Sequence, residues 1–509
     1  MRQFQLFQLV LLCITINTVQ CANILGVYPF PSKSHCILGH ALLKGLVQRG
    51  HNVTMLTTYP MEKSSENYTE LLMDVNLTKK AYERVISNRA WYKPIIVNTY
   101  SAFTMISKAL FQDPVVQQLI NSTDSYDVVI YSHLTQFALL GLSHTFNASS
   151  VLFSVISANH MLAHTMNLPQ PASYVPNLFC PYGETMTFFQ RMHNLVINIV
   201  GYLHLRFVNE PVERKLLEDN FPGAPSLDEL VGNIQLVLIN SHITLDPIRP
   251  IFQNTISIGG YYMDDRKPLS EDVQTFLDSS ERGVIYFSFG SNVKYKHLPK
   301  DMVRKFIAAF EQMPYDVLWK IDVFPPNIPS NVKIVTWVSQ LSVLVHPNVK
   351  MFIAHGGKGG MNEAIYFGVP TLFFPFYADQ QMNAKDAVAA GIALELDLND
   401  FTENDLIASA NELIRNPFYK KNIMQRSDLI RNQGMHPLDK AEYWINYVAK
   451  NPNSKFMQSR ATKMPWYQVI MLDLFAVLFI CFIFIGICLY FICCSVIRFI
   501  MQGNKFKRD

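Results

Sequence analysis

The stretch that decides the fold runs from Trp337 to Gln380 and reads WVSQLSVLVHPNVKMFIAHGGKGGMNEAIYFGVPTLFFPFYADQ. Apolar runs at Val349–Ala354 and Thr371–Phe376 predict two buried parallel strands, and Met361–Phe367 between them predicts a short helix. The intervening turn, His355–Gly360, contains four glycines, which let the backbone approach a ligand closely. The unpaired N–H groups and positive dipole end of the following helix favour phosphate. This strand–turn–helix–strand unit therefore suits a nucleotide diphosphate.

Side chains around this unit could hold the rest of a nucleotide sugar. Trp337 supplies a flat ring for a base, and Gln340, three residues later, supplies an amide for the edge of that base. The Glu363 carboxylate could accept from ribose hydroxyls, and Asp379 with Gln380, just past the second strand, could bind a sugar. In open α/β sheets, ligands bind at the loops after the carboxyl ends of the strands. The pattern predicts a site for a nucleotide sugar.

The stretch resembles the signature of the membrane-bound animal UDP-glycosyltransferases, and most closely of their arthropod members. The matching positions are Trp337, Gln340, His355–Gly357, Glu363, Gly368–Pro370 and Asp379–Gln380. The resemblance implies an α/β fold of two facing Rossmann-like domains (GT-B type) plus one C-terminal transmembrane helix. It also implies inverting transfer of a hexose from a UDP-sugar, with UDP-glucose favoured, to a hydroxyl of a small lipophilic acceptor. No metal or other cofactor is implied, because the turn and the helix dipole supply the electrostatic stabilisation.

The rest of the chain fits two such domains. Strands are predicted at Ile24–Tyr28, Val53–Thr57, Asp127–Tyr131, Val151–Val155, Leu236–Asn240 and Val284–Phe289. We expect an acceptor-binding domain over 22–245 and a UDP-sugar-binding domain over 246–455. In the family, the helix predicted at His436–Val448 crosses back to brace the first domain.

The resemblance assigns the phosphates to Ser291 and to the turn of His355, Gly356, Gly357 and Gly360. Family members often carry asparagine or serine four or five residues after the turn histidine, where this chain has Gly359 and Gly360. Lys358 could supply compensating charge. Arg249, in an RP pair, is expected to be structural or to face the diphosphate.

The resemblance assigns the general base to His35, in the PSKSH loop after the first strand. The family orients this histidine with an acid five residues after the aspartate that opens a later strand, but five residues after Asp127 lies Ser132. A serine can hold an imidazole and cannot supply charge. Either Asp124 or Asp127 compensates, or the base is impaired. Two alternatives to an active transferase therefore stay open: a donor-binding relative with weak or no catalysis, and a single-pass receptor or carrier for lipophilic ligands.

The two ends predict a membrane protein. Residues 1–21 fit a secretory signal peptide, and the apolar run Leu474–Ile497, within a transmembrane region predicted at 469–497, is long enough to span a bilayer. The tail, 498–509, is basic, which predicts a cytosolic tail and a luminal body. Its end, KFKRD, resembles an endoplasmic-reticulum retrieval signal, although an ordinary positive-inside anchor would look similar. A luminal body agrees with sequons at Asn52, Asn67, Asn76, Asn121 and Asn147.

Composition excludes some classes and leaves others open. The formal charge of +3 without a basic stripe gives no indication of nucleic-acid binding. Only Cys36 and Cys180 fall in the globular part, which favours two free thiols over a bridge and provides no metal set. The apolar helix predicted at Met186–Phe207 is either a core helix or a face over the acceptor site or the bilayer surface. The identity of the acceptor and a homo-oligomeric state stay open.

Overall fold

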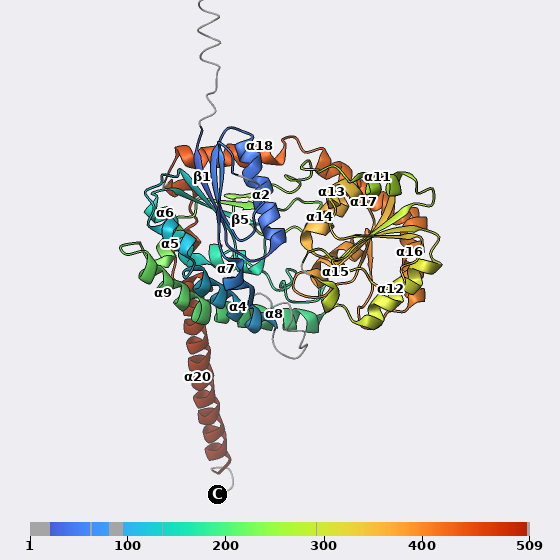
Figure 1. Cartoon of the computed structure of the whole chain (residues 1–509). Helices are drawn as coiled ribbons and strands as arrows, with labels where there is room; N and C mark the ends of the chain where they lie inside the picture. The colour runs from blue at the N-terminus through green and yellow to red at the C-terminus, as the bar shows by residue number, and fades with distance from the viewer. Residues whose placement is uncertain are drawn as a thin grey trace, which may run out of the picture. The chain divides into compact units, whose positions relative to one another are not determined.

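The computed structural model describes residues 21–61, 64–80, 95–134, 136–291, 293–452 and 454–505. The chain divides into a body, which ends at Gln458, and a C-terminal unit that starts at Ser459. The body contains two lobes, each built around a parallel sheet (Figure 1).

The sheet of the first lobe has seven parallel strands in the order β3-β2-β1-β4-β5-β6-β7. They are β1 (Asn23–Tyr28), β2 (Asn52–Thr57), β3 (Tyr68–Leu72), β4 (Val128–Ser132), β5 (Ser149–Ser154), β6 (Leu236–Ile239) and β7 (Thr255–Ser257). In the register of the two central strands, Val27 of β1 pairs with Tyr131 of β4. The predicted parallel sheet is confirmed.

Helices cover both faces of this sheet. They are α2 (Lys33–Val47), α4 (Ile95–Leu110), α5 (Pro114–Ile120), α6 (Gly141–Thr145), α7 (His160–Met166), α8 (Phe188–His204), α9 (Glu210–Asn220) and α10 (Leu227–Gly232). Neighbouring strand residues alternate between two apolar cores: Ile24 packs with α2, and Leu25 packs on the opposite side with α4. Because both faces are buried, the central strands are largely apolar, whereas the edge strand β3 contains Thr69 and Glu70.

The second lobe repeats the plan with six parallel strands in the order β10-β9-β8-β11-β12-β13. They are β8 (Val284–Ser288), β9 (Asp316–Lys320), β10 (Val332–Val335), β11 (Val349–Ala354), β12 (Thr371–Phe373) and β13 (Ala393–Glu395). Its helices are α11 (Glu271–Asp278), α12 (Lys300–Gln312), α13 (Gln340–Leu344), α14 (Lys358–Phe367), α15 (Gln380–Ala389), α16 (Glu403–Arg415) and α17 (Pro417–Arg431). The strand predicted over Thr371–Phe376 is therefore shorter, since the chain leaves the sheet after Phe373.

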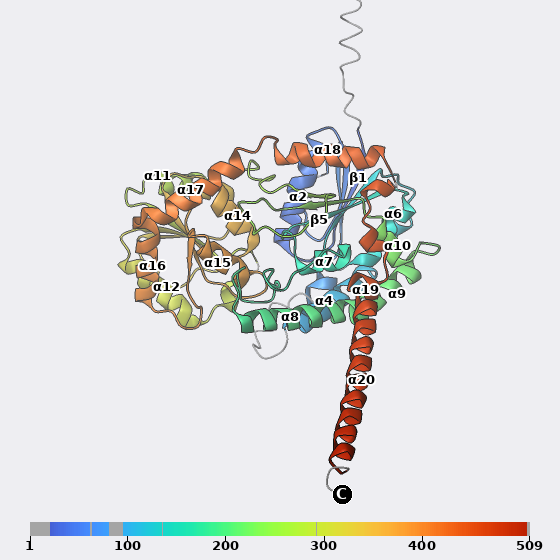
Figure 2. The same cartoon turned by 180° about the vertical axis from the view of Figure 1, so that it is seen from behind.

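The last helix of the body, α18 (Pro437–Lys450), returns to the first lobe and lies beside β1 and α2 (Figures 1 and 2). Its Ile445 is fully buried in the core that contains β1. Ser149 donates to the carbonyl of Val448 (2.9 Å), and Arg49 forms an ion pair with Glu442 (3.3 Å). The expected brace across the two lobes is confirmed.

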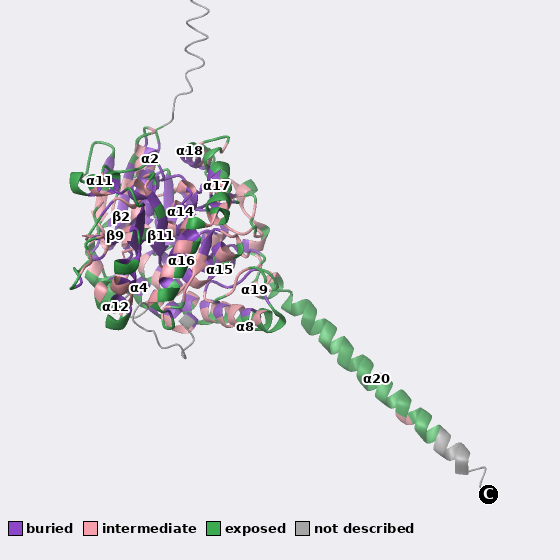
Figure 3. Ribbon diagram, turned by 90° about the vertical axis from the view of Figure 1, so that its right-hand side faces the viewer, coloured by how far each residue is buried: buried purple, intermediate pink, exposed green. Residues whose placement is uncertain are grey.

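One of the two interpretations of the apolar helix after residue 186 is wrong. The segment forms α8, which continues through a π-helical turn (Leu205–Asn209) into α9. It is not a core helix, because its large apolar side chains are exposed, among them Phe189 at 78%. Figure 3 shows α8 at the surface of the body, coloured mainly as exposed and intermediate.

The C-terminal unit contains α19 (Trp466–Val469) and α20 (Leu472–Lys505). Within α20, Leu472–Phe499 is long and apolar enough to cross a membrane, and none of its most apolar part is buried (Figure 3). The helix begins at Leu472, after a left-handed Met471 (φ +54°). The predicted leader up to residue 20 and the tail from residue 506 lie outside the described residues.

Candidate functional site

Two turns of the second lobe meet at the carboxyl ends of β8 and β11. Gly290, after β8, has a left-handed backbone (φ +77°), and a Cβ there would lie 2.8 Å from the His355 ring. Gly356, after β11, is also left-handed (φ +81°), and its Cβ would lie 2.7 Å from the Gln380 carbonyl. Only glycine fits both conformations and both contacts. The predicted phosphate residues Ser291 and His355–Gly357 therefore come from adjacent turns.

His355 lines this site with an imidazole that is uncharged near neutral pH. Burial lowers the pKa of its imidazole to about 4, and nearby Lys320 contributes to the shift. Its Nδ1 atom is buried without a hydrogen-bond partner among the described residues. The positive end of α14, which starts at Lys358 after Gly357, lies in the same turn. Phosphate stabilisation by this turn would therefore come from the helix end and not from imidazolium charge.

The residues predicted for uracil and ribose contact each other. Gln340 Nε2 donates to Glu363 Oε2 (2.6 Å), and Tyr286 OH donates to Gln340 Oε1 (3.3 Å). Burial raises the pKa of Glu363 to about 7. Tyr262, which follows β7, donates to the carbonyl of Gly359 (3.4 Å). The Glu363 carboxylate therefore changes its charge near neutral pH.

Trp337, predicted to stack on the base, is 55% exposed and is approached by lysines from both lobes. The Lys33 Nζ atom of α2 lies 4.1 Å from the ring centroid, and Lys320 Nζ lies 4.6 Å from it. Lys320 also donates to the carbonyl of Gly290 (3.2 Å). Burial, with a smaller contribution from nearby Lys294, lowers the pKa of Lys320 to about 8. Positive charge is therefore concentrated between Trp337 and the glycine turn that is predicted to bind phosphate.

The predicted sugar-binding pair is anchored to the same turn. Asn383 Nδ2 donates to Asp379 Oδ2 (2.7 Å) and to the carbonyl of Gly356 (2.9 Å). Gln380 is buried, and its Oε1 accepts from the backbone N–H groups of Phe376 (2.8 Å) and Tyr377 (3.1 Å). The Gln380 oxygen is therefore used by the loop, which leaves its N–H₂ group for a ligand.

The suggestion that Lys358 adds charge to the phosphate turn is wrong. Its ammonium is buried and points at Asp246 Oδ1 (2.5 Å) and the Leu245 carbonyl (2.7 Å). Gly359 leaves open space, because a Cβ there would meet only Glu363 Oε1 at 4.0 Å. A Cβ on Gly360 would make ordinary contacts with Phe352 (3.4 Å) and the Gln340 amide (3.5 Å). Side chains would therefore fit at both glycines.

His35 lies in the first turn of α2 and not in the loop before it. The helix begins at Lys33, since Ser32 takes an extended N-cap conformation (φ −125°, ψ 117°) and its carbonyl accepts from the His35 N–H (3.1 Å). The imidazole packs against Phe30, with 5.2 Å between ring centroids. Burial lowers the pKa of His35 to about 4, and no charged group in the described part of the chain contributes. Its Nδ1 atom has no hydrogen-bond partner among the described residues.

Ser132 and His35 lie at the same edge of the first sheet, and the Ser132 hydroxyl forms no hydrogen bond with the imidazole. Ser132 ends β4, which neighbours β1, the strand before His35. The Ser132 hydroxyl is buried and, within the described part of the chain, has no partner. Asp127 is no substitute acid, because it lies at the other end of β4, where its Oδ2 accepts from the Asn23 N–H (2.8 Å). Asp124 does not contribute to the pKa of His35 either.

The remaining expectations concern Arg249 and the cysteines. Arg249 donates to the carbonyl of Ala158 (3.1 Å) and contacts the Met382 sulfur (3.6 Å), so it joins the first lobe to α15, as the structural alternative expects. Cys36 and Cys180 are buried free thiols, which confirms the favoured interpretation.

The sequence prediction missed Lys320 and Tyr262. The signal for Lys320 was a charge at the carboxyl end of the apolar run VLWK, where ligands of α/β sheets bind. Tyr262 carries no comparable signal, since its position depends on how the segment between the lobes passes α14.

Two parallel-sheet lobes with these groups at the strand ends define the class, a two-domain glycosyltransferase of the GT-B type. The family model described as UDP-glucoronosyl and UDP-glucosyl transferase matches residues 27–507. The chain belongs to this family of UDP-glycosyltransferases, which transfer a sugar from a UDP-sugar.

Relatives agree with this assignment. UDP-glucosyltransferase 2 of Dactylopius coccus is 30% identical over 517 residues, and the match covers 99% of both chains. Human UDP-glucuronosyltransferase 2B15 is 29% identical over 536 residues, with 99% of this chain and 98% of the relative covered. The solved glycosyltransferase VinC in complex with DTDP has the same fold, with a TM-score of 0.57, 17% identity, and coverage of 84% of this chain and 100% of that chain.

Proposed function

We propose that this enzyme transfers glucose from UDP-glucose, with inversion, to the hydroxyl of a small lipophilic acceptor. The observation that carries the donor part is the contact between Gln340 and Glu363 beside Trp337 and the glycine turn. The full-length similarity to the Dactylopius coccus UDP-glucosyltransferase is what supports glucose as the proposed sugar.

In the proposed mechanism, the second lobe binds the donor. Trp337 and Gln340 hold uracil, Glu363 holds ribose, and Asp379 with the Gln380 amide holds the sugar. The turn of His355, Gly356, Gly357 and Gly360, together with Ser291, holds the diphosphate. The acceptor oxygen attacks the anomeric carbon while the bond from that carbon to the β-phosphate oxygen breaks. His35 takes the hydroxyl proton, and the α14 N-terminus and Lys320 stabilise the departing UDP.

The test is sugar transfer by membranes that carry the full chain. UDP-glucose, UDP-glucuronic acid and UDP-galactose are each supplied with a panel of phenols and small alcohols, and the anomeric configuration of the product is determined. We expect the β-glucoside as the main product. A clear preference for UDP-glucuronic acid would contradict the donor assignment.

A second candidate function is donor binding with weak or no catalysis. The observation in its favour is that His35 has neither an acidic neighbour nor a hydrogen bond at Nδ1 among the described residues. Under this alternative, UDP binds to the full chain and no donor–acceptor pair reacts, even in the Ser132→Asp variant.

We further propose that α20 anchors the protein in the endoplasmic-reticulum membrane, with the body in the lumen. The apolar length of Leu472–Phe499 and the basic residues that follow support this orientation. Protease treatment of sealed microsomes should leave the body intact. Digestion of the body in sealed microsomes would contradict the luminal orientation.

A further inference from the structure

Helix α8 presents its apolar side to the outside of the body. Large side chains exposed by about half or more recur along it at helical spacing, and they are Phe188, Phe189, Met192, Leu195, Val196, Ile199 and Leu203. At 100° per residue these seven lie within an arc of about 120°. Phe207 and Val208 extend the exposed apolar surface past the π-helical turn.

The side of the helix that faces the protein carries Asn194 and Asn198 together with the apolar side chains of Ile197 and Val200, which pack against the core. Asn194 is fully buried, where its Nδ2 donates to the carbonyls of Ala172 and Val175 (both 2.9 Å) and its Oδ1 accepts from the Asn177 N–H (2.7 Å). Asn198 Oδ1 accepts from the Asn177 side chain (2.8 Å). Helix α8 therefore buries polar and apolar side chains together, while its largest apolar side chains face outward, where a surface helix usually carries polar ones.

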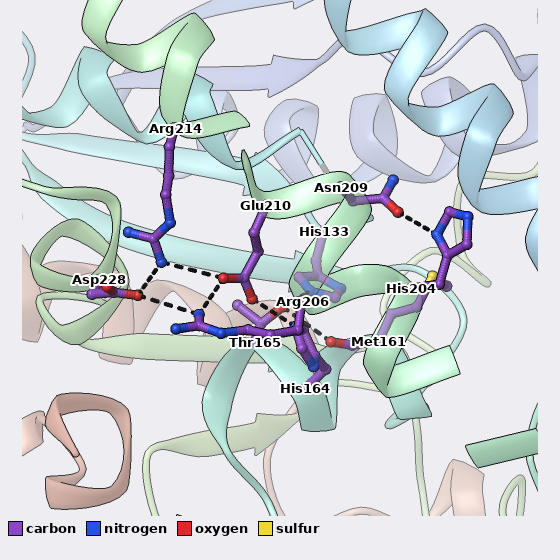
Figure 4. A network of polar contacts seen from close by, with 10 residues as sticks. All are labelled: His133, Met161, His164, Thr165, His204, Arg206, Asn209, Glu210, Arg214 and Asp228. Atoms are coloured by element: carbon purple, nitrogen blue, oxygen red, sulfur yellow. Dashed lines mark hydrogen bonds and ion pairs between the residues drawn. The ribbon is translucent and has the colours of Figure 1, made fainter. Parts of the chain in front are cut away.

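Buried polar contacts continue after α8. Asn209 is buried, and its Nδ2 donates to the Tyr100 carbonyl and to Thr104 Oγ1 (both 2.8 Å). Figure 4 shows Asn209 beside His204, and Glu210 between Arg206 and Arg214, with Asp228 completing an ionic network next to α7. Polar contacts and the inward apolar side chains Ile197, Val200 and Leu205 therefore fix the α8–α9 segment to the body, while the exposed apolar side chains of α8 point away from it.

We propose that the outward face of α8 lies in the interfacial layer of a lipid bilayer, a second membrane contact besides α20. The proposal rests on the membrane anchor proposed above. The body is tethered close to the bilayer that α20 would cross, because only residues 459–471 join the body to α20. This connection spans at most about 45 Å. The segment Phe188–His204 contains no acidic residue, and Arg191 is exposed, so an anionic lipid surface would not repel it.

This contact would place the acceptor-binding lobe against the phase in which lipophilic acceptors dissolve. The acceptor could then reach the enzyme by diffusion in the membrane. A second copy of the chain is the other apolar occupant that would cover such a face, and the experiment separates the two.

The test uses the full chain reconstituted into vesicles of phosphatidylcholine and phosphatidylserine that contain a phosphatidylcholine with a photoreactive diazirine on its acyl chain. After illumination, labelled peptides are mapped by mass spectrometry. We expect lipid adducts in two regions, 188–208 and 472–499. The combined substitutions Val196→Glu and Ile199→Glu should reduce labelling of 188–208 at least fivefold and leave labelling of 472–499 and UDP binding unchanged.

The matched control is Leu429→Glu on α17, an equally exposed apolar residue of the other lobe, which should change neither region. Adducts confined to 472–499 would overturn the α8 contact and keep the anchor. Adducts absent from 472–499 would instead overturn the anchor. A bifunctional amine-reactive crosslinker is added to the same vesicles in a second arm; links between two copies near 188–208, without lipid adducts there, would assign this face to a dimer and overturn the inference.

Discussion

The residues proposed to bind the donor and the residues proposed to carry out catalysis differ in how many hydrogen bonds they form with one another. In the second lobe, the groups assigned to the donor contact one another: Gln340 bonds to Glu363, and Asn383 joins Asp379 to the glycine turn. In the first lobe, His35 has no hydrogen bond at Nδ1 and no acidic neighbour that affects its pKa, and the Ser132 hydroxyl has no partner among the described residues.

We expect this difference to affect donor affinity and turnover rate in different ways. Side chains that are held before the ligand arrives lose little conformational freedom on binding, so the donor site is preorganised. A base with a pKa of about 4 accepts a proton weakly. We therefore expect ordinary donor affinity combined with a modest turnover rate, and the predictions below test the two sets of residues separately.

The largest effect should come from His35→Ala, which removes the base. We expect kcat to fall by about 10²-fold, at the low end for a general base because the histidine lacks an acidic partner. UDP affinity, measured by calorimetry, should stay the same, since His35 belongs to the acceptor lobe. His144→Ala, at an exposed histidine of the same lobe, is the control. An unchanged kcat in His35→Ala would assign the base to another group.

Lys320→Met should weaken UDP binding by about tenfold, because the variant loses the charge between Trp337 and the phosphate turn. The matched control is Lys350→Met, whose ammonium bonds to a backbone carbonyl at the far end of β11. If both variants bind UDP as tightly as the unmodified protein, Lys320 is structural.

Donor KM should vary several-fold with pH and be lowest between about pH 7 and pH 8. The Glu363 carboxyl has a pKa raised to about 7, so it ionises and accepts from ribose as the pH rises through 7. The Lys320 ammonium has a pKa lowered to about 8, so its charge is lost above that pH. In steady-state kinetics, the profile of donor KM against pH should lose its low-pH rise in the Glu363→Gln variant. It should lose its high-pH rise in the Lys320→Met variant. A flat profile in the unmodified protein would contradict both assignments.

The smallest effect should come from Gly359→Asn, which restores a side chain where the backbone is helical and space is open. We expect donor KM to fall about two- to threefold through a new hydrogen bond near Glu363. Gly434→Asn, at an open position outside the two lobes' site residues, should leave KM unchanged. A rise in KM would mean that the space at Gly359 is needed by the donor.

The sequence predicted the two parallel sheets well, because strands buried on both faces produce unbroken apolar runs. It also predicted which residues gather at the donor site, since Trp337 to Gln380 are local to one βαβ unit. The Lys320 contact was not predictable from that unit, because it depends on β9 lying next to β8 in the sheet.

The orientation of α8 could not be inferred from periodicity, which gives an apolar stripe without saying what faces it. The usable signal was that asparagines 194 and 198 lie outside the apolar arc, where a core helix would expose them. The sequence also could not show whether His35 has an acidic partner. Ser132 indicated that the family's acid is missing, but only the fold shows that Asp127 lies at the far end of β4 and cannot replace it.

The most direct test of the unassisted base is the pH dependence of kcat, at saturating donor and acceptor, for the unmodified protein, Ser132→Asp and the uncharged control Ser132→Asn. Because only neutral imidazole takes the proton, a pKa of about 4 predicts a rate that is flat from about pH 5 to about pH 8. The new carboxylate in Ser132→Asp should raise the pKa of His35, move the acidic limb up by about one to two pH units, and raise the plateau by about tenfold. Ser132→Asn should resemble the unmodified protein. An acidic limb near pH 6.5 in the unmodified protein, unchanged by Ser132→Asp, would show that the pKa of the base is not lowered by burial and would contradict the account.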